Sequence, residues 1–187
     1  MSLQFLPVLG DGINDAEDFL CARCARRQKT CCQQTDIVLT YGDVARIAAF
    51  AGQSDFIDCR PAGNPAYADQ EDDPTWRDAT FDGLGLRRVV RWQANGDCTF
   101  LGPVGCTLPL ETRPLICRLF PFDYTEAGLY DEAAAGCPTQ LLPPGQALFD
   151  ALGMRRADAE RWHAQLYAEL KADLSVRTLQ PASHPTC

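Results

Sequence analysis

The last third of the chain carries its clearest apolar pattern. Trp162, Leu166, Leu170 and Leu174 recur every four residues in a segment that begins at about Arg156. Residues four apart lie on one face of a helix, so this spacing predicts an amphipathic helix whose apolar stripe faces the core. A shorter helix is predicted just before it, in GQALFDALG, which follows two prolines.

Two helices are also predicted in the first third. Thr40 precedes YGDVARIAAFA, and Asp43 follows three residues later, which is the pattern of a capping box; Gly52 ends the segment. Further upstream, Asn14 or Asp15 can cap a helix through AEDFLCARCARR, with acidic residues in its first turn and basic residues later.

The middle of the chain changes to strand-like patterns. LRRVVRW and DCTFL flank Asn95-Gly96, which predicts two strands joined by a tight turn. FDYTEAGLYDEA predicts a second hairpin that turns near Gly128. Residues 36–39 are expected to be extended, and a short helix is expected to start at Ser54.

These elements predict an α+β fold, a compact single domain in which helices from both ends pack around short β-hairpins. A chain of 187 residues has the length of one ordinary domain. We expect this domain to cover residues 1–178, and the Pro- and Ser-rich residues 179–187 to form a flexible tail.

The chain has ten cysteines, more than a domain of this size needs for packing. Its first residues, MSLQFLPVLGDGINDAEDF, lack the basic start and apolar run of a signal peptide, and no segment has the length of a membrane span. We therefore expect a cytoplasmic protein without a membrane partner, where clustered cysteines indicate metal or redox chemistry more often than disulfides.

The formal net charge of −8 argues against one class of partner. An acidic protein repels phosphate backbones, so we expect no nucleic-acid binding. The acidic run from Asp69 to Asp73 is expected to be a solvated loop, because it lacks the glycine and spacing of a calcium loop.

The cysteines fall into two groups. CARCARRQKTCC holds a CxxC followed by two adjacent cysteines, and the second group is spread over GDCTFLGPVGCTLPLETRPLICRLFPF and the region beyond it. Two thiolates three residues apart can grip one tetrahedral ion, although a lone CxxC can also be a redox pair. Eight cysteines are the predicted metal ligands, enough for two four-thiolate sites or one larger cluster: Cys21, Cys24, Cys31, Cys32, Cys98, Cys106, Cys117 and Cys137.

Two arginines are predicted to support these ligands from behind. Arg113 and Arg118 flank the segment that carries Cys117, and nearby cations favour the thiolate form. Pro114 and Pro121 are expected to confine that segment to a single turn of helix, a rigid mount for a ligand.

The remaining candidates favour structural roles. Cys59 is expected to be a small buried residue and Cys187 a free thiol, while His163 and His184 are more often structural or exposed than metal ligands. The chain has no Walker phosphate loop, no GxSxG elbow and no complete dinucleotide fingerprint, so no organic cofactor is expected and no catalytic residue is assigned.

The segments CARCARRQKTCC, DIVLTYGDVARIA, DCTFLGPVGC and ETRPLICRLFPF resemble the CxxCxxCC family, also called YkgJ-like cysteine-cluster proteins. The resemblance spans about residues 21 to 122 and implies a zinc- or iron-chelating domain. Six residues separate Cys24 from Cys31, whereas the family name implies two. Flagellin lysine methylase is similar over the same cysteines.

Three hypotheses follow. The first is a metal-binding protein that chelates zinc or iron, including an iron–sulfur cluster, with metal ions as its partners. The second is an iron–sulfur enzyme, either an oxidoreductase or a protein lysine methyltransferase, and the third is a disulfide-stabilised protein without metal. All-thiolate sites suit zinc and iron–sulfur clusters alike, so the sequence leaves the metal open.

Overall fold

The structure is a computed structural model that describes residues 20–25, 27–33, 35–64, 70–103, 105–133 and 137–179. Its main helices are α1 (Leu20–Ala25), α2 (Tyr41–Ala51), α3 (Pro74–Thr80), α4 (Leu115–Leu119), α5 (Leu148–Leu152) and α6 (Arg156–Leu179). Its strands are β1 (Ile57–Arg60), β2 (Arg87–Val90), β3 (Leu101–Gly102), β4 (Gly105–Cys106), β5 (Phe122–Thr125) and β6 (Gly128–Ala133). Short 3-10 helices are η1 (Cys31–Gln33), η3 (Leu110–Thr112) and η4 (Thr139–Leu141).

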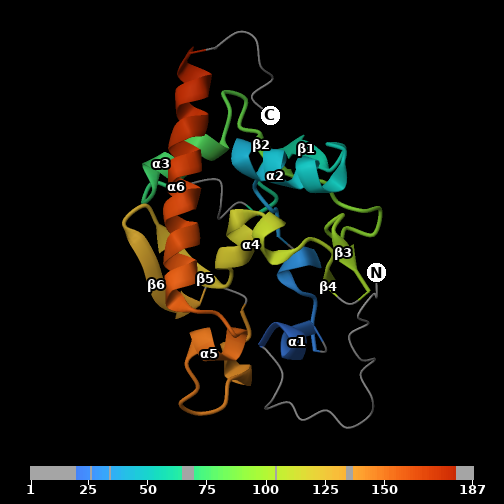
Figure 1. The fold of residues 1–187 in the computed structure, drawn as a ribbon, viewed down its shortest axis with the longest axis vertical. Helices are drawn as coiled ribbons and strands as arrows, with labels where there is room; N and C mark the ends of the chain where they lie inside the picture. The colour runs from blue at the N-terminus through green and yellow to red at the C-terminus, as the bar shows by residue number, and fades with distance from the viewer. Residues whose placement is uncertain are drawn as a thin grey trace.

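In the described residues, the strands form three separate antiparallel pairs, β1–β2, β3–β4 and β5–β6, with the helices around them. This confirms the predicted α+β fold of helices and short hairpins. Helix α6 runs along one side of the molecule, with α4 beside it near the centre (Figure 1). No helix in the described part of the chain is long and apolar enough to span a bilayer.

Two apolar cores lie on opposite sides of the segment 36–39 and β2. Val38 and Val89 pack into the first core, whereas their neighbours Leu39 and Val90 pack into the second. Successive residues of an extended chain point to opposite faces, so one alternating pattern serves both cores. The segment 36–39 is extended, as predicted, and Val38 forms a bridge with Val89.

Helix α6 closes the first core with the predicted stripe. Trp162, Leu166 and Leu170 are almost fully buried there, together with Leu115 and Leu119 of α4. The stripe prediction is confirmed, and the helix continues to Leu179, past Leu174, the last residue of the stripe.

Several other predictions are confirmed. Thr40 and Asp43 form the capping box of α2, and Gly52 ends the helix in the left-handed conformation, at φ 71°. The hairpin of β5 and β6 turns where expected, and α4 is a single short helix between prolines. The predicted caps at Asn14 and Asp15 lie outside the described residues, as does the tail from residue 180.

Three predictions of local structure were wrong in whole or in part. The residues after Ser54 form strand β1 rather than a helix, and β1 pairs with β2 over its whole length. The predicted hairpin at Gly96 is present but shorter than expected: Trp92 forms a bridge with Cys98, the Gln93 N–H donates to the Asp97 carbonyl at 2.7 Å and the Thr99 N–H donates to the Arg91 carbonyl at 3.1 Å. β2 itself does not pair with DCTFL, because β1 lies along one of its edges and the segment 36–39 along the other. The prediction of a solvated loop for the acidic run was wrong at its last residue, Asp73.

Asp73 is buried and caps a helix that the sequence analysis missed. Its carboxylate accepts a hydrogen bond from the Trp76 N–H at 2.9 Å, and Pro74 occupies the first turn of α3. Glu71 and Asp72 are exposed, as expected of a solvated loop. The prediction was therefore wrong for Asp73, whose carboxylate is part of the fold.

Candidate metal centre

Four of the predicted ligands come together in the second core. Cys98 is buried there among Ile37, Leu39 and other apolar side chains, and three more cysteines pack against this core: Cys32, Cys106 and Cys117. We refer to these four as the four-thiol group. They come from four separate segments, which are η1, the turn before β3, β4 and α4.

Backbone contacts hold these segments in register. The Cys98 N–H donates to the Cys32 carbonyl at 2.7 Å, which joins η1 to the turn before β3. Cys106 faces Leu101 across the β3–β4 pair. Cys117 lies in α4, whose first-turn N–H groups include the Cys117 N–H, bonded to the Pro114 carbonyl at 2.9 Å.

Burial and mutual charge set the protonation of the thiols. Burial raises the pKa of Cys117 well above its ordinary value, and negative charge on Cys32, Cys98 and Cys106 raises it further. Burial also raises the pKa of Cys98 to about 11. Without a cation, these thiols therefore resist ionisation together, and a bound cation would favour the thiolates.

Cys32 has the opposite tendency. A hydrogen bond from Cys31 and the positive charge of Arg113 lower the pKa of Cys32 to about 7, against the effect of burial. A thiol of this kind ionises near neutral pH and is a ready first ligand.

The donor set suits a soft or borderline metal, because four thiolates are the ligands of structural zinc and of iron–sulfur sites. Within the described residues, however, no three Cys, His, Asp or Glu side chains stand at the spacing of a formed metal site. The structure thus gathers the thiols into one region of the core and leaves their ligation a prediction.

The other predicted ligands lie around α1. Cys24 is buried in this helix, and α1 packs against η4 and α5. Next to Cys24, the Arg23 guanidinium donates to the Leu141 carbonyl at 2.7 Å and to Gln146 Oε1 at 3.2 Å. Cys137 lies two residues before η4, so the fold brings the segments of Cys24 and Cys137 to one region. The side chain of Cys21 is outside the described part of the structure.

Residues 20–138, more than half of the chain, match the sequence model of the CxxCxxCC family. This protein belongs to the CxxCxxCC family. The family is described as a proposed zinc- or iron-chelating domain, and its matched segment includes all eight predicted ligands. Membership supports metal binding and zinc or iron as the metal. No curated protein and no solved structure matches the chain.

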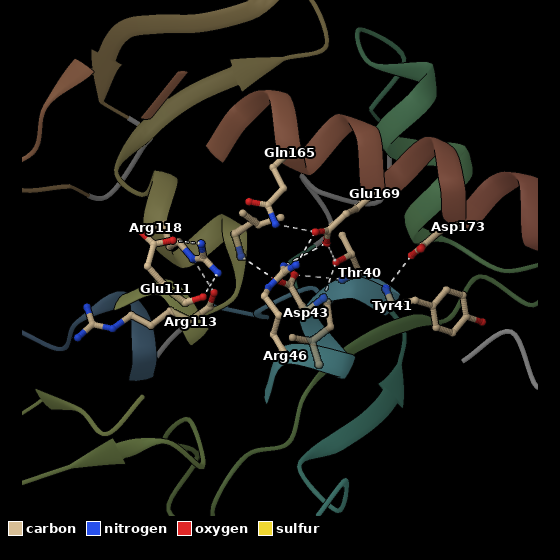
Figure 2. Close-up of polar contacts among 12 residues, drawn as sticks. Thr40, Tyr41, Asp43, Arg46, Glu111, Arg113, Arg118, Gln165, Glu169 and Asp173 are labelled. Carbon is tan, nitrogen blue, oxygen red and sulfur yellow. Dashed lines mark hydrogen bonds and ion pairs between the residues drawn. The ribbon is translucent and has the colours of Figure 1, made fainter. Parts of the chain in front are cut away.

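The two arginines predicted to support the ligands of this CxxCxxCC protein differ in their contacts. The charge of Arg113 acts on Cys32, and its Nε donates to the Leu108 carbonyl at 3.1 Å. Arg118 is buried, and it donates to Glu111 Oε2 at 2.9 Å and to the Arg113 carbonyl at 2.8 Å (Figure 2). These contacts hold the turn before α4 in place. Arg118 therefore affects the position of Cys117 through the backbone.

The residues expected to be structural lie apart from the four-thiol group. Cys59 sits in β1 opposite Arg88, and His163 Nε2 lies 2.8 Å from the Thr125 carbonyl oxygen. Among the cysteines whose side chains are described, Cys24, Cys32, Cys59, Cys98, Cys106 and Cys117 are free thiols. Cys187 and His184 lie outside the described residues.

A polar network that the sequence pattern did not predict lies between α2 and α6. Asp43 and Arg46 of α2 meet Glu169 of α6, and Arg46 Nη1 lies 2.5 Å from Glu169 Oε1 (Figure 2). The capping box had identified Asp43 as a helix cap. Nothing in the sequence pattern places Glu169 at its side, because residue 169 follows 126 residues later and belongs to the polar edge of the α6 stripe.

Proposed function

We propose that this CxxCxxCC protein chelates zinc or iron through clustered cysteine thiolates. The observation that carries the proposal is the four-thiol group, in which four distant segments deliver cysteines to one partly buried region. Apolar packing alone does not require four sulfurs in one place. Four thiolates can complete a tetrahedral coordination shell without any other ligand.

The eight cysteines divide into two sets in this proposal. The four-thiol group forms one site, and Cys21, Cys24, Cys31 and Cys137 form the other. The division is supported by the packing of α1 on η4 and α5, which separates Cys24 and Cys137 from the second core. Cys31 and Cys32 are adjacent and joined by a hydrogen bond, so the two sites would be neighbours.

Proton release accompanies metal binding at such sites. A divalent cation displaces the thiol protons, and the raised pKa values of Cys98 and Cys117 mean that these protons are present before the metal arrives. Arg113 offsets part of the negative charge that accumulates near Cys32. The bound metal would supply cross-linking of distant segments and, for an iron–sulfur cluster, electron transfer.

The test is anaerobic purification followed by metal, sulfide and thiol analysis and a visible spectrum. We expect about two zinc ions per chain and no colour, or iron with sulfide and a brown colour. Iron with sulfide would also open the enzymatic alternatives, an oxidoreductase or a methyl-transfer protein. Metal-free protein whose cysteines are oxidised to disulfides would contradict the proposal.

Substitutions then assign the sites. We expect Cys98→Ser and Cys117→Ser to remove the metal of the four-thiol group, and Cys24→Ser and Cys137→Ser to remove the other. Cys59→Ser is the matched control, because Cys59 is half-buried like several ligands but lies in β1. Equal loss of metal in the Cys59 variant would contradict the assignment.

Chelation tests whether the metal is part of the fold. Structural zinc contributes roughly 10 to 16 kcal/mol of apparent binding free energy, more than the net stability of most domains. We therefore expect a strong chelator to unfold the protein or to lower its melting temperature sharply. Full thermal stability after metal removal would show that the metal is cargo and not a structural element.

A further inference from the structure

Asp43 lies fully buried where helices α2, α4 and α6 meet (Figure 2). Its Oδ2 accepts a hydrogen bond from the Thr40 N–H at 3.2 Å, and its Oδ1 accepts one from the Leu115 N–H at 3.0 Å. Arg46 Nη2 lies 2.6 Å from Oδ1 and balances the charge. One carboxylate thus accepts hydrogen bonds at the N-termini of two helices, although Asp43 and Leu115 are 72 residues apart in the chain.

The contact with Leu115 matters because α4 cannot cap itself. Its N-cap residue, Pro114, makes no side-chain cap hydrogen bond, although the first N–H groups of a helix need external acceptors. Asp43 supplies an acceptor from α2. Cys117 follows Leu115 by two residues, in the same turn, so the orientation of Cys117 depends on where Asp43 holds the start of α4.

The α2 side of the Asp43–Leu115 contact is connected to the segments that carry Cys32 and Cys98. Between Cys32 and α2, the chain is fixed to β2 by the Leu39 N–H, which donates to the Arg88 carbonyl at 3.0 Å, and by the Val90 N–H, which donates to the Ile37 carbonyl at 2.8 Å. The start of α2 therefore has a set position relative to the second core.

We propose that Asp43 is a positioning residue for the metal centre. By holding the start of α4, Asp43 keeps Cys117 at the correct distance from Cys32 and Cys98. This inference rests on the proposed function. Residues behind the ligands of a metal site commonly change metal affinity by about 10- to 100-fold when they are replaced.

The network around Asp43 keeps its carboxylate in place. Arg46 also bonds Glu169, whose carboxylate accepts from the Thr40 hydroxyl at 2.5 Å and from Gln165 Nε2 at 2.8 Å. Gly42 permits this approach, since a Cβ at that position would lie 2.2 Å from Glu169 Oε2. The side chain of Asp43 is thus fixed from α2 and from α6, as a positioning group requires.

Asp73 offers a matched control for Asp43. It is also a buried aspartate at a helix N-terminus, where it accepts from the Trp76 N–H at 2.9 Å and the Glu126 N–H at 3.1 Å, and from the Tyr167 hydroxyl. The helix that it caps, α3, contains no cysteine. Loss of either carboxylate removes comparable hydrogen bonds, but only Asp43 is linked to a predicted ligand segment.

The experiment is an anaerobic Co²⁺ titration of the reduced, metal-free wild type, Asp43→Asn and Asp73→Asn, followed by thiolate-to-cobalt charge transfer and the visible ligand-field bands. We expect Asp43→Asn to bind Co²⁺ about 10- to 100-fold more weakly and with altered ligand-field bands. Asp73→Asn is expected to keep the ligand-field bands of the wild type. Because metal binding is coupled to folding, its affinity is expected to fall only as far as its own loss of stability accounts for.

Every other outcome contradicts either the proposed function or the positioning role of Asp43. A wild type without thiolate-to-cobalt bands contradicts the proposed function and this inference with it. Wild-type affinity and bands in Asp43→Asn, or the same altered bands in Asp73→Asn, overturn the positioning role alone. If Asp43→Asn does not fold, Arg46→Gln tests the same link, since the Arg46 side chain is 25% exposed; a severalfold loss of affinity is expected, and an unchanged affinity contradicts the inference.

Discussion

The buried pair of Arg88 on β2 and Asp173 on α6 gives a sharp test of how α6 is held. Arg88 Nη2 lies 2.9 Å from Asp173 Oδ2, and each side chain is 5% exposed. Arg88 Nε donates to the Leu39 carbonyl at 3.0 Å, and its guanidinium lies 3.7 Å from the centre of the Tyr41 ring. The Tyr41 N–H, the first of α2, donates to the same Asp173 oxygen at 3.0 Å.

Asp173→Asn keeps the shape of this site and removes its negative charge. Removal of one partner of a buried ion pair costs about 3 to 5 kcal/mol, because the other charge remains buried without its counterion. Burial raises the pKa of Asp173, although the Tyr41 N–H and Arg88 act against that rise. The aspartate itself is therefore costly to ionise, and we expect a loss near the lower end, about 3 kcal/mol.

Urea denaturation followed by circular dichroism, at a fixed free metal concentration, measures this loss. The double variant Arg88→Met, Asp173→Leu is the control, since it removes both charges and restores apolar volume. We expect it to recover part of the stability lost in Asp173→Asn, because both charges are gone, although the Tyr41 N–H and the Leu39 carbonyl lose these hydrogen bonds. A loss below about 1 kcal/mol in Asp173→Asn would refute the argument, because that is the range of an exposed ion pair.

Three further predictions concern pH, packing and the cysteines. Burial raises the pKa of Glu169, but hydrogen bonds, of which that from Arg46 is the largest, outweigh burial and lower this pKa below its ordinary value of 4.5. The wild type should therefore be more stable than Glu169→Gln above pH 4.5, and this difference in stability should shrink as the pH falls further. Denaturation curves of the two proteins, measured in parallel at each pH, test this. A constant difference would contradict this. Leu119→Ala should cost about 2 to 5 kcal/mol, measured by urea denaturation, because Leu119 is 0% exposed in the first core. Cys98→Ser should change the Co²⁺ spectrum and Cys59→Ser should leave it unchanged; equal effects would contradict the four-thiol group.

Local signals predicted the helices well where they were self-contained. The capping box of Thr40 and Asp43 and the stripe of Trp162, Leu166 and Leu170 are read within a few residues, and both were confirmed. Helix α3 also had such a signal, Asp73 followed by Pro74. It was missed because the acidic residues before it favoured a solvated loop.

Pairing between distant strands was harder to predict. β1 pairs with β2, about thirty residues later, with Ile57 opposite Val90. Nothing in the sequence of either strand predicts that register. The tight turn at Gly96 favoured a hairpin that included β2, but the hairpin contacts are limited to residues 91–99, because β2 pairs with β1 and with the segment 36–39. The same holds at the site: the cysteines were identifiable from sequence, whereas the link from Asp43 to Leu115 depends on the packing of α2 against the segment of α4.

The position of α6 has a consequence for how a CxxCxxCC domain can be isolated. The family match ends at residue 138, but α6, from Arg156 to Leu179, supplies the core against Leu115 and Leu119 and the carboxylates that hold the start of α2. A fragment cut at the family boundary would keep all eight predicted ligands and lose the helix that packs against α4 in the first core. We therefore expect the folding unit to be longer than the matched segment, and a truncated domain to need α6 in order to fold.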